Sequence, residues 1–525
     1  MKSLICSLIK NRRLKEARTL LSNLPSPSPY LPTLLINAYA QSNQLGNALE
    51  VFNQIPVQDT ICWNSMIQCC LDCGDLQAAE RLFNRMPRKN VVSQTTMLSG
   101  YMKLKMLKEA ENLFHSMPVK DAAASNVMLH GYFENGKLEE GIRHFEEMPV
   151  KNVISWTCAI RGFDESLEGF SLFKKMMNAS VLPTATTLCC VLSASVNVGN
   201  PNFGIQIHGL AVKLGYHFDE FLMASLITCY GDGKRMEDAI AVFKEIETRN
   251  VVVWTALLTA YNINSMHEYS LEIFRKMVKM RVVPNQSTFS SALSSCWELD
   301  AIDMGKTIHG FAVKLSLQSD VFVGNNLVVM YGKCGKLEHA ASVFNGILHK
   351  NDVSWNSIIS ASAQHGHGLM ALTLFSQMLR SLVEPDAITF TSLLSACSHS
   401  GMVDKGKHLF NYLMRFKPGA AKLQHYACMA DMLGRDGKLT EAEKLLQHMP
   451  MKGNAAVWLA LLGAAVVHSN LEIAELAAEK VFKFEPNSSV ANVLLANLYA
   501  SCNRWTNVSH LRIAAKERGL SWFTL

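Results

Sequence analysis

Residues 82–90 read LFNRMPRKN, residues 113–121 read LFHSMPVKD and residues 144–152 read HFEEMPVKN. Met86, Met117 and Met148 are therefore 31 residues apart, and each stretch ends on Asn or Asp. A phrase that returns every ~20–50 residues indicates a stack of structural repeats. Repeats begin at residues 29, 60, 91 and 122 and continue as 153–184, 185–219, 220–250, 251–285, 286–320, 321–351, 352–386, 387–422 and 423–454.

Each repeat has the pattern of two helices. In repeat 91–121, Leu107, Ala110, Phe114 and Met117 recur at intervals of three and four residues, which is one apolar stripe of a second helix. Glycines between the helices suit the left-handed residue that ends a helix: Gly74, Gly136, Gly335, Gly366, Gly401 and Gly437. Prolines are expected to stop the second helix: Pro56, Pro87, Pro118 and Pro149.

The first helix carries an aromatic residue at its fourth position in six repeats: Trp63, Trp156, Trp254, Phe289, Trp355 and Phe390. These rings could stack on nucleobases, but they lie on the core stripe, so we expect them to pack in the core. One helix pair cannot bury its stripe alone, whereas stacked pairs can. The predicted fold is therefore all-α, a right-handed α-solenoid superhelix of stacked helix-turn-helix repeats.

Composition narrows the possible functions. The chain has 525 residues, is 49% hydrophobic and has a formal net charge of +6. Residues 1–28 contribute +5 of that charge, so a nucleic-acid partner would have to meet local positive fields. The longest apolar run, Ala455–Val467, is shorter than the ~18 residues of a membrane helix and favours a buried helix. The 14 Cys form no paired framework, which favours a reducing compartment.

Position 5 of the first helix is repeatedly a short polar residue: Thr33, Asn64, Thr95, Asn126, Thr157, Thr255, Ser290, Asn325, Asn356 and Thr391. Asn, Thr and Ser are not the best helix formers, and a purely structural face would tolerate Ala, Lys or Glu. One short polar group per repeat is what RNA recognition at one base per repeat requires.

Longer phrases such as VVSQTTMLSGYMKLKMLKEAENLFHSMPVKD (residues 91–121) and VFVGNNLVVMYGKCGKLEHAASVFNGILHKN (residues 321–351) resemble pentatricopeptide repeats. The mixture of repeat lengths resembles the PLS subclass of plant organelle proteins. Tetratricopeptide repeats, which bind peptides, share the Ala110–Phe114 spacing but have a steadier length and a Leu-Gly pair that is absent here. Residues 455–525 resemble two divergent helix pairs of the E-type extension, which the family often continues into a deaminase segment ending in Asp-Tyr-Trp. From where the chain stops we expect either an E-type C-terminus without that domain, which works with a deaminase in trans, or a truncated extension that has lost that role.

The resemblance implies that position 5 and the last residue of the same repeat read one RNA base together. Thr or Ser with Asp implies G, Thr or Ser with Asn A, Asn with Asp U, and Asn with Asn C. The implied pairs are Thr33/Asp59 (G), Asn64/Asn90 (C), Thr95/Asp121 (G), Asn126/Asn152 (C), Thr255/Asn285 (A), Ser290/Asp320 (G, in an L-type repeat where the code is less dependable), Asn325/Asn351 (C) and Asn356/Asp386 (U). Repeats 153–250 are doubtful readers, because repeat 153–184 has a shortened turn and ends on Thr184, and Cys189 and Ala224 occupy position 5.

Two alternatives remain for these positions. The terminal Asn or Asp could serve only as the N-cap of the next helix, although capping and base reading are compatible. Position 2 is mostly apolar, and in the family this residue wedges between bases; ordinary packing between repeats is the alternative. The expected wedges are Ile61, Val92, Val252, Phe322 and Val353, with Ile154 and Ile388 in the same register.

No catalytic constellation is evident. The zinc-deaminase signature of H-x-E followed by P-C-x-x-C is absent, and the CxxC of Cys70–Cys73 has no partner pair. We therefore expect no catalytic residue, metal or cofactor. The resemblance implies a binding protein for single-stranded organelle RNA that selects a site for C-to-U editing and recruits a DYW-type cytidine deaminase in trans with other editing factors; an RNA stability or splicing role without editing and a peptide-binding scaffold are the alternatives. No membrane partner is expected.

Localisation is weakly encoded. Residues 1–28 fit a truncated repeat or a short targeting segment, and the family tendency favours the mitochondrion over the chloroplast.

Overall fold

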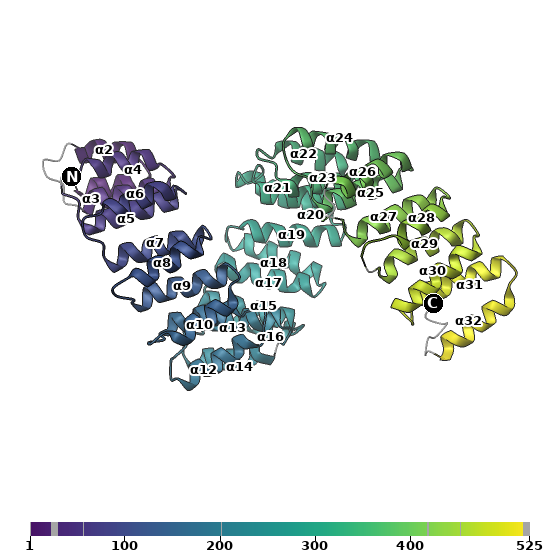
Figure 1. Cartoon of the computed structure of the whole chain (residues 1–525), viewed down its shortest axis with the longest axis horizontal. Coiled ribbons are helices and arrows are strands. Elements are labelled where there is room, and N and C mark those ends of the chain that lie inside the picture. The colour runs from purple at the N-terminus through teal and green to yellow at the C-terminus, as the bar shows by residue number, and fades with distance from the viewer. Residues whose placement is uncertain are drawn as a thin grey trace. The chain divides into compact units, whose positions relative to one another are not determined.

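The computed structural model describes residues 2–22, 30–55, 57–200, 202–416, 419, 421–451 and 453–517. Across this part of the chain the regular structure is entirely helical, with 32 α-helices that follow one another in pairs (Figure 1). The chain divides into two compact blocks, residues 1–260 and 261–525. Within each block the pairs stack as an α-solenoid, which confirms the predicted fold class.

In the N-terminal block the odd-numbered helices are the first and the even-numbered helices the second of each pair. The pairs are α1 (Lys2–Lys10) and α2 (Leu14–Ser22), α3 (Tyr30–Gln41) and α4 (Leu45–Asn53), α5 (Thr60–Asp72) and α6 (Leu76–Arg85), α7 (Val91–Lys103) and α8 (Leu107–Ser116), α9 (Ala122–Glu134) and α10 (Leu138–Glu147), α11 (Val153–Gly162) and α12 (Glu168–Asn178), α13 (Ala185–Asn197) and α14 (Asn202–Lys213), and α15 (Glu220–Asp232) and α16 (Met236–Glu245). Helix α17 (Val251–Ile263) contains the boundary between the blocks.

The same alternation continues in the C-terminal block, where α18 (His267–Lys279) comes first. The following pairs are α19 (Gln286–Glu298) and α20 (Ile302–Lys314), α21 (Val321–Lys333) and α22 (Leu337–Gly346), α23 (Asp352–Gln364) and α24 (Gly368–Arg380), α25 (Ala387–His399) and α26 (Val403–Phe416), α27 (Leu423–Arg435) and α28 (Leu439–Gln447), α29 (Ala455–Val467) and α30 (Leu471–Phe484), and α31 (Ser489–Ser501) and α32 (Trp505–Glu517).

The fourth position of the first helix joins neighbouring repeats through aromatic contacts. Trp156 meets Phe145 of the preceding second helix edge to face, with ring centroids 4.9 Å apart. The pairs Phe243–Trp254 and Phe344–Trp355 repeat this geometry at 4.9 Å. All three indoles are buried, so the expectation that they are core residues is confirmed. A row of identical contacts explains why one phrase returns along the chain.

The ends of the helices follow the predicted turn chemistry. All six glycines expected between paired helices have a left-handed backbone, with φ between +66° and +78°. Helix α6 ends at Arg85, and Met86 then adopts an extended backbone, as a residue before proline must. Met117 and Met148 do the same before their prolines, and all three Met side chains are buried. Pro56 lies outside the described residues.

First helices of successive repeats pack on one another through a pair of positions that complement each other in size. A Cβ added to Gly131, at position 10, would lie 2.4 Å from the side chain of Met102, at position 12 of the repeat before. Gly100 faces Leu71 and Gly162 faces Phe133 in the same way, whereas Gly231 and Gly332 instead face Ala260 and Ala361. A large residue on one helix thus meets glycine on the next, and glycine meets alanine.

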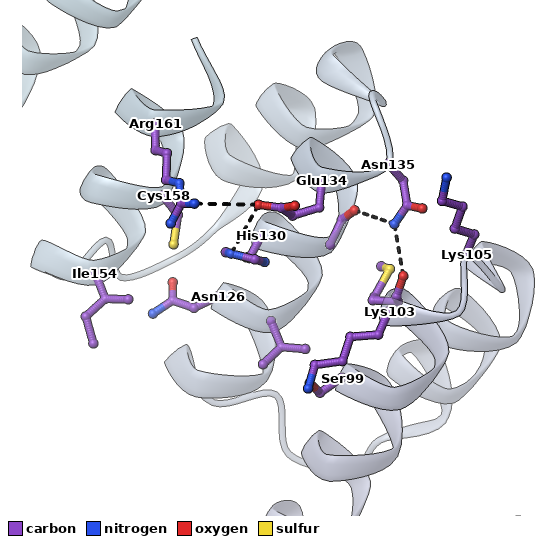
Figure 2. A pocket seen from close by; sticks show the side chains of 13 residues that line it. Ser99, Lys103, Lys105, Asn126, His130, Glu134, Asn135, Ile154, Cys158 and Arg161 are labelled. Atoms are coloured by element: carbon purple, nitrogen blue, oxygen red, sulfur yellow. Dashed lines mark hydrogen bonds and ion pairs between the residues drawn. The ribbon is translucent and has the colours of Figure 1, made fainter. Parts of the chain in front are cut away.

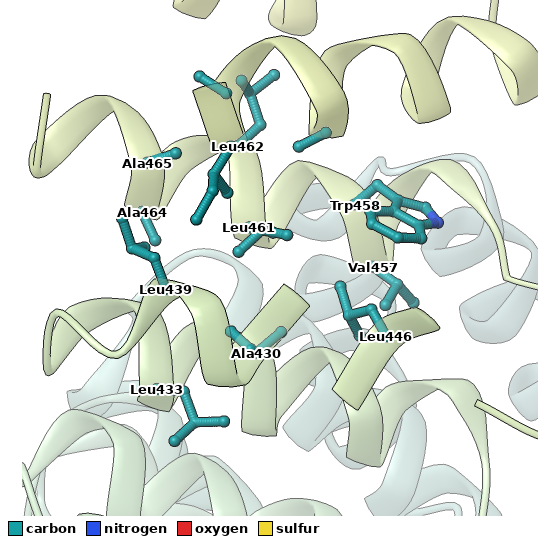
Figure 3. Packing of buried hydrophobic residues seen from close by; sticks show 14 of the residues in the cluster. Ala430, Leu433, Leu439, Leu446, Val457, Trp458, Leu461, Leu462, Ala464 and Ala465 are labelled. Carbon is teal, nitrogen blue, oxygen red and sulfur yellow. The ribbon is translucent and has the colours of Figure 1, made fainter. Parts of the chain in front are cut away.

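The C-terminal helices share one apolar core. Figure 3 shows Leu446 of α28 beside Val457 and Trp458 of α29. Leu433 of α27 and Leu461 of α29 belong to the same cluster of buried residues. Helix α29 covers the longest apolar run of the sequence and is buried over most of its length, which confirms that it is a core helix. In the part of the chain that the structure describes, no helix is both long and apolar enough to cross a membrane.

Candidate RNA interface

The last residue of a repeat caps the first helix of the next. Its side-chain Oδ1 accepts the backbone N–H of the third helical residue, with N–O distances of 2.8 to 3.0 Å at Asp59, Asn90, Asp121, Asn152, Asn285, Asp320, Asn351 and Asp386. Asn and Asp are among the strongest N-caps because they satisfy an N–H that has no partner within the helix. The capping role considered for these residues is therefore real.

In three repeats the same side chain also contacts position 5. The Asn126 amide donates to Asn152 Oδ1 at 3.3 Å, and Asn325 donates to Asn351 Oδ1 at 3.3 Å. The Asn356 amide donates to Asp386 Oδ1 at 3.1 Å. The structure thus brings together the two members of these three expected base-reading pairs, although they are 26 to 30 residues apart in sequence.

Threonine at position 5 behaves differently from asparagine. The Thr95 and Thr255 hydroxyls donate to the carbonyl oxygens of Val91 and Val251, at 2.8 and 2.7 Å. Because a hydroxyl has one proton, it then presents only lone pairs to a ligand. Thr33 instead lies 3.2 Å from the thiol of Cys62, and Thr255 and Asn285 belong to different blocks.

Ser290 and Asp320 are both engaged elsewhere. Ser290 donates to Asn326 Oδ1 at 3.1 Å, and Asp320 Oδ2 accepts from Gln286 Nε2 at 2.9 Å. The second oxygen of this carboxylate is therefore occupied in addition to the capping oxygen. The less dependable code expected for this L-type repeat stays a prediction.

Position 5 is more buried than a simple helical wheel suggests. Thr33, Asn126, Asn325 and Asn356 are each 7 to 9% exposed, because adjacent first helices close over them. The Oδ1 atoms of Asn64 and Asn325 are buried and accept no hydrogen bond. Buried polar atoms without a partner are rare in folded proteins, so these two atoms need an explanation.

The terminal carboxylate of repeat 352–386 is held in its charged form. Burial alone would raise the pKa of Asp386, but its carboxylate accepts hydrogen bonds from the Thr389 N–H and the Asn356 amide, and the Thr389 hydroxyl, whose one proton it shares with Asn356 Oδ1, lies 2.9 Å away. Together with the Ile388 N–H these donors outweigh burial and leave the pKa of Asp386 below its ordinary value.

Within each block the wedge positions form an exposed apolar row. Ile61, Val92, Phe322 and Val353 are 48 to 63% exposed, and Val252 is half-buried. Ile154 and Ile388, in the same register, are also exposed. Packing between repeats therefore does not bury most of these side chains.

A pocket of about 680 Å³ opens on this face across repeats 91–162 (Figure 2). Its lining includes Asn126, the wedge-register residue Ile154 and the cations Lys103, Lys105 and Arg161. Glu134 lies between His130 and Arg161, at 3.7 and 4.0 Å, and is joined to both in Figure 2. An expected base reader thus shares a hollow with positive charge suited to a phosphate backbone.

No group of three or more His, Cys, Asp or Glu among the described residues could hold a metal ion.

Comparison with protein-family models identifies the family to which these repeats belong. The PPR repeat model matches residues 32–58, 61–91, 95–121, 124–153, 223–251, 325–351, 388–417 and 425–454. The PPR repeat family model matches 350–399 and the pentatricopeptide repeat domain model matches 241–298, so repeat models cover more than half of the chain. The chain belongs to the pentatricopeptide repeat family. An E motif model matches residues 468–522, within the C-terminal block.

Curated pentatricopeptide repeat proteins from Arabidopsis thaliana are similar over long stretches. At5g46460, named as mitochondrial, is 49% identical over 66% of this chain and 50% of its own length. At3g57430, named as chloroplastic, is 38% identical over 70% of this chain and 43% of its own length. The chain therefore spans about half the length of these relatives.

A solved pentatricopeptide repeat structure shares the fold. The crystal structure of PPR10 in complex with an 18-nt psaJ RNA element matches with a TM-score of 0.62 at 17% identity. The match covers 98% of this chain and 83% of PPR10.

Two contacts of this pentatricopeptide repeat protein were not expected from sequence. The hydroxyl at position 3 of a repeat touches the pair of the repeat before it, as Ser155 does with Asn126. The penultimate cation of a repeat lies over a second-helix phenylalanine, as Lys151 lies 5.4 Å from the ring centroid of Phe145 while donating to Met148 O at 2.8 Å. Lys89, Lys120, Arg249 and Lys350 repeat the ring contact. Both contacts could have been predicted from the sequence, because the hydroxyl and the cation recur at fixed positions of the repeat.

Proposed function

We propose that this protein binds single-stranded RNA sequence-specifically, with one base opposite each competent repeat. The observation that carries the proposal is the three contacts between position 5 and the terminal residue, made beside an exposed apolar row. Two polar groups for a base edge and an apolar side chain for its face are the elements of single-stranded RNA recognition. The RNA named with PPR10 is consistent with this use of the fold.

The cap gives the proposed code a chemical basis. In each terminal residue Oδ1 is committed to the helix N–H, so the atom left for RNA is Nδ2 in Asn152 and Oδ2 in Asp386. Asn then offers a donor and Asp an acceptor. C and A present an acceptor at the ring nitrogen of their pairing edge, whereas U and G present an N–H. Terminal Asn therefore suits C or A, and terminal Asp suits U or G.

The implied target reads, from 5′ to 3′, G-C-G-C, three unread bases, then A, G, C and U, followed by two weak positions. Repeats 29–152 supply the first four bases and repeats 251–386 the A, G, C and U, of which the G of Ser290/Asp320 is the weakest. Residues 29–454 would form the RNA-reading array and residues 455–525 the E-type extension. We interpret residues 1–28 as a truncated repeat, supported by the packing of α1 and α2 on α3.

The finer proposal is site recognition for C-to-U editing in a plant organelle, with the mitochondrion favoured over the chloroplast. The match to an E motif supports it. The chemistry would come from a DYW-type cytidine deaminase acting in trans, recruited through the E-type extension together with other editing factors. The protein would then be a binding factor and not itself an enzyme.

Binding of the implied RNA by the full chain tests the base-reading proposal. Asn356→Thr should change the preferred base opposite repeat 352–386 from U to G, since Thr with Asp implies G, by about tenfold in relative affinity. Fluorescence anisotropy with four RNAs that differ only at that base would measure it.

Asn345→Thr makes the same exchange on the exposed face of a second helix and should leave the preference unchanged. An unaltered preference for U in Asn356→Thr would refute the code assignment. Selective binding of peptides and not of RNA would favour the scaffold alternative.

Transcript sequencing in a plant that lacks the gene tests the editing role. Loss of C-to-U conversion at one or a few organelle sites downstream of the target sequence is expected. Intact editing together with altered transcript abundance or splicing would contradict the editing role while leaving RNA binding in place.

A further inference from the structure

A hydroxyl group from the next repeat lies directly behind two of the position 5 asparagines. Ser155 Oγ lies 2.7 Å from Asn126 Oδ1 and 3.0 Å from Asn152 Oδ1. Thr389 Oγ1 lies 2.6 Å from Asn356 Oδ1 and 2.9 Å from Asp386 Oδ1. Both hydroxyl residues are fully buried, so their single proton has only protein acceptors, and the shorter distance is to the asparagine in each case.

The sequence repeats this arrangement wherever position 5 is asparagine. Asn64, Asn126, Asn325 and Asn356 are followed at position 3 of the next repeat by Ser93, Ser155, Ser354 and Thr389. When position 5 is Thr or Ser, position 3 of the next repeat varies: Cys62, Ala124, Thr187, Thr288, Val323 and His425. A hydroxyl at position 3 therefore accompanies every asparagine but not every threonine or serine.

The contact decides which end of the carboxamide faces outward. When Oδ1 of Asn126 accepts from Ser155, and one Nδ2 hydrogen goes to Asn152, the remaining Nδ2 hydrogen is the only donor left for a ligand. A carboxamide turned over by 180° would instead present its oxygen. Because the two orientations have the same shape, packing alone does not choose between them, whereas the Asn152 acceptor beside Nδ2 and the Ser155 donor beside Oδ1 together favour the orientation shown.

In the repeats of Asn64 and Asn325 the serine at position 3 of the next repeat donates elsewhere. Their Oδ1 atoms are buried without a partner, while Ser93 donates to the Asn90 carbonyl oxygen and Ser354 donates to Asn351 Oδ1. The orphaned oxygens belong to position 5 and the serines to position 3 of the next repeat, which are the positions that are in contact at Asn126 and Ser155.

We propose that the hydroxyl at position 3 of one repeat is a positioning residue for the asparagine at position 5 of the repeat before it, and holds that amide as a donor toward a pyrimidine. Threonine does not need this residue, because its proton already goes to its own helix. The proposal rests on the proposed RNA-reading function. Pyrimidine preference would then depend on three side chains: position 5 and the last residue of one repeat, and position 3 of the next repeat.

Ser155 is the position at which to test it. In the full chain, Ser155→Ala should lower the preference for C over A opposite repeat 122–152 about fivefold, the equivalent of one hydrogen bond. Ser155→Thr should retain the preference. Affinities for RNAs that differ at that base, and at the base opposite repeat 91–121 as an internal reference, would be measured together with thermal unfolding.

Ala124→Ser is the matched control, because it adds a hydroxyl behind Thr95, whose proton is already committed. It should leave the base preference of repeat 91–121 unchanged; a comparable change there would overturn the proposal. If Ser155→Ala binds every RNA more weakly but still discriminates C from A, the hydroxyl is only structural and the proposal is wrong.

Ser155→Cys, which keeps the volume and weakens the donor, serves if the alanine variant unfolds, and should show the same loss of preference. Wild-type protein that binds RNA without discriminating at this base would instead refute the proposed function itself, so the two failures are distinct.

Discussion

At the scale of single residues, the last side chain of a repeat caps the next helix through Oδ1 and leaves its other polar atom for the proposed RNA ligand. The spacing of the repeat was sufficient to predict Asn152 and Asp386, and the structure places both against their position 5 partners. The sequence did not predict the hydroxyl of Ser155 in the same contact. That contact depends on how closely two first helices approach, and local propensity carries no such information.

The depressed pKa of Asp386 predicts how its cap responds to acid. Because the folded pKa lies below the ordinary value of 3.8, the stabilisation is fully present above that value and is lost as the pH falls through the lower folded pKa. The wild-type protein should therefore protect the Thr389 N–H from hydrogen exchange better than Asp386→Asn does at pH 5 to 7. Below about pH 3.8 this advantage should shrink.

Protection factors from NMR or mass spectrometry, corrected for intrinsic exchange, would measure the effect. The Ala124 N–H, capped by Asp121, is an internal comparison that the substitution does not touch. An advantage that grows as the pH falls would contradict the assignment.

At the scale of helices, the period was readable because the core contacts are identical from one repeat to the next. The Met-Pro phrase and the left-handed glycines predicted where helices end. The size match between positions 12 and 10 was not predicted, because it joins residues of two repeats and alternates between a large residue with glycine and glycine with alanine.

This size match predicts that a glycine-to-alanine substitution, which usually stabilises a helix, destabilises the protein at position 10. Alanine normally favours a helix over glycine by about 1 kcal/mol, and Gly209→Ala, in open space on α14, should stabilise the protein by up to that amount. Gly131→Ala should instead destabilise it by ~1–3 kcal/mol, because Met102 Cβ would be 2.7 Å from the new methyl group. Urea titration of the two variants would measure the difference.

Met102→Ala combined with Gly131→Ala should recover part of the loss, since it removes all the Met102 atoms beyond Cβ that crowd the site. Equal behaviour of Gly131→Ala and Gly209→Ala would show that the packed glycine has no steric role.

At the scale of the whole chain, the repeats are not equivalent. Helix α11 has 10 residues where α9 has 13. The turn to α12 spans residues 163–167, whereas the turn after α9 spans only 135–137, so the expected shortening of the turn was wrong and the shortening lies in the first helix. Thr157, which would read a base, is bonded to Thr187 at 2.8 Å and to Val153 at 2.7 Å. The weak base reading expected of repeats 153–250 stays a prediction. The sequence did not mark the boundary between blocks at residue 260, which depends on how the helices pack and not on residue type.

The unequal repeats predict a target with a silent centre. Replacing the three bases opposite repeats 153–250 should change affinity by no more than about twofold. Replacing the three bases opposite repeats 29–121 should weaken binding by about 100-fold or more, because each mismatch removes roughly 1–3 kcal/mol. Competition binding with the two altered RNAs would measure this, and a large loss from the central replacement would contradict the silent centre.

The cap at the end of each repeat also affects how such a protein can be changed to recognise another RNA sequence. Exchanging Asn for Asp replaces one amino group by one oxygen on the far side of the capping atom, and either residue caps a helix well. Under the proposed code, new specificity would therefore be acquired one repeat at a time while the helix cap is kept. Natural selection or an engineer could then explore a large set of target sequences through single substitutions.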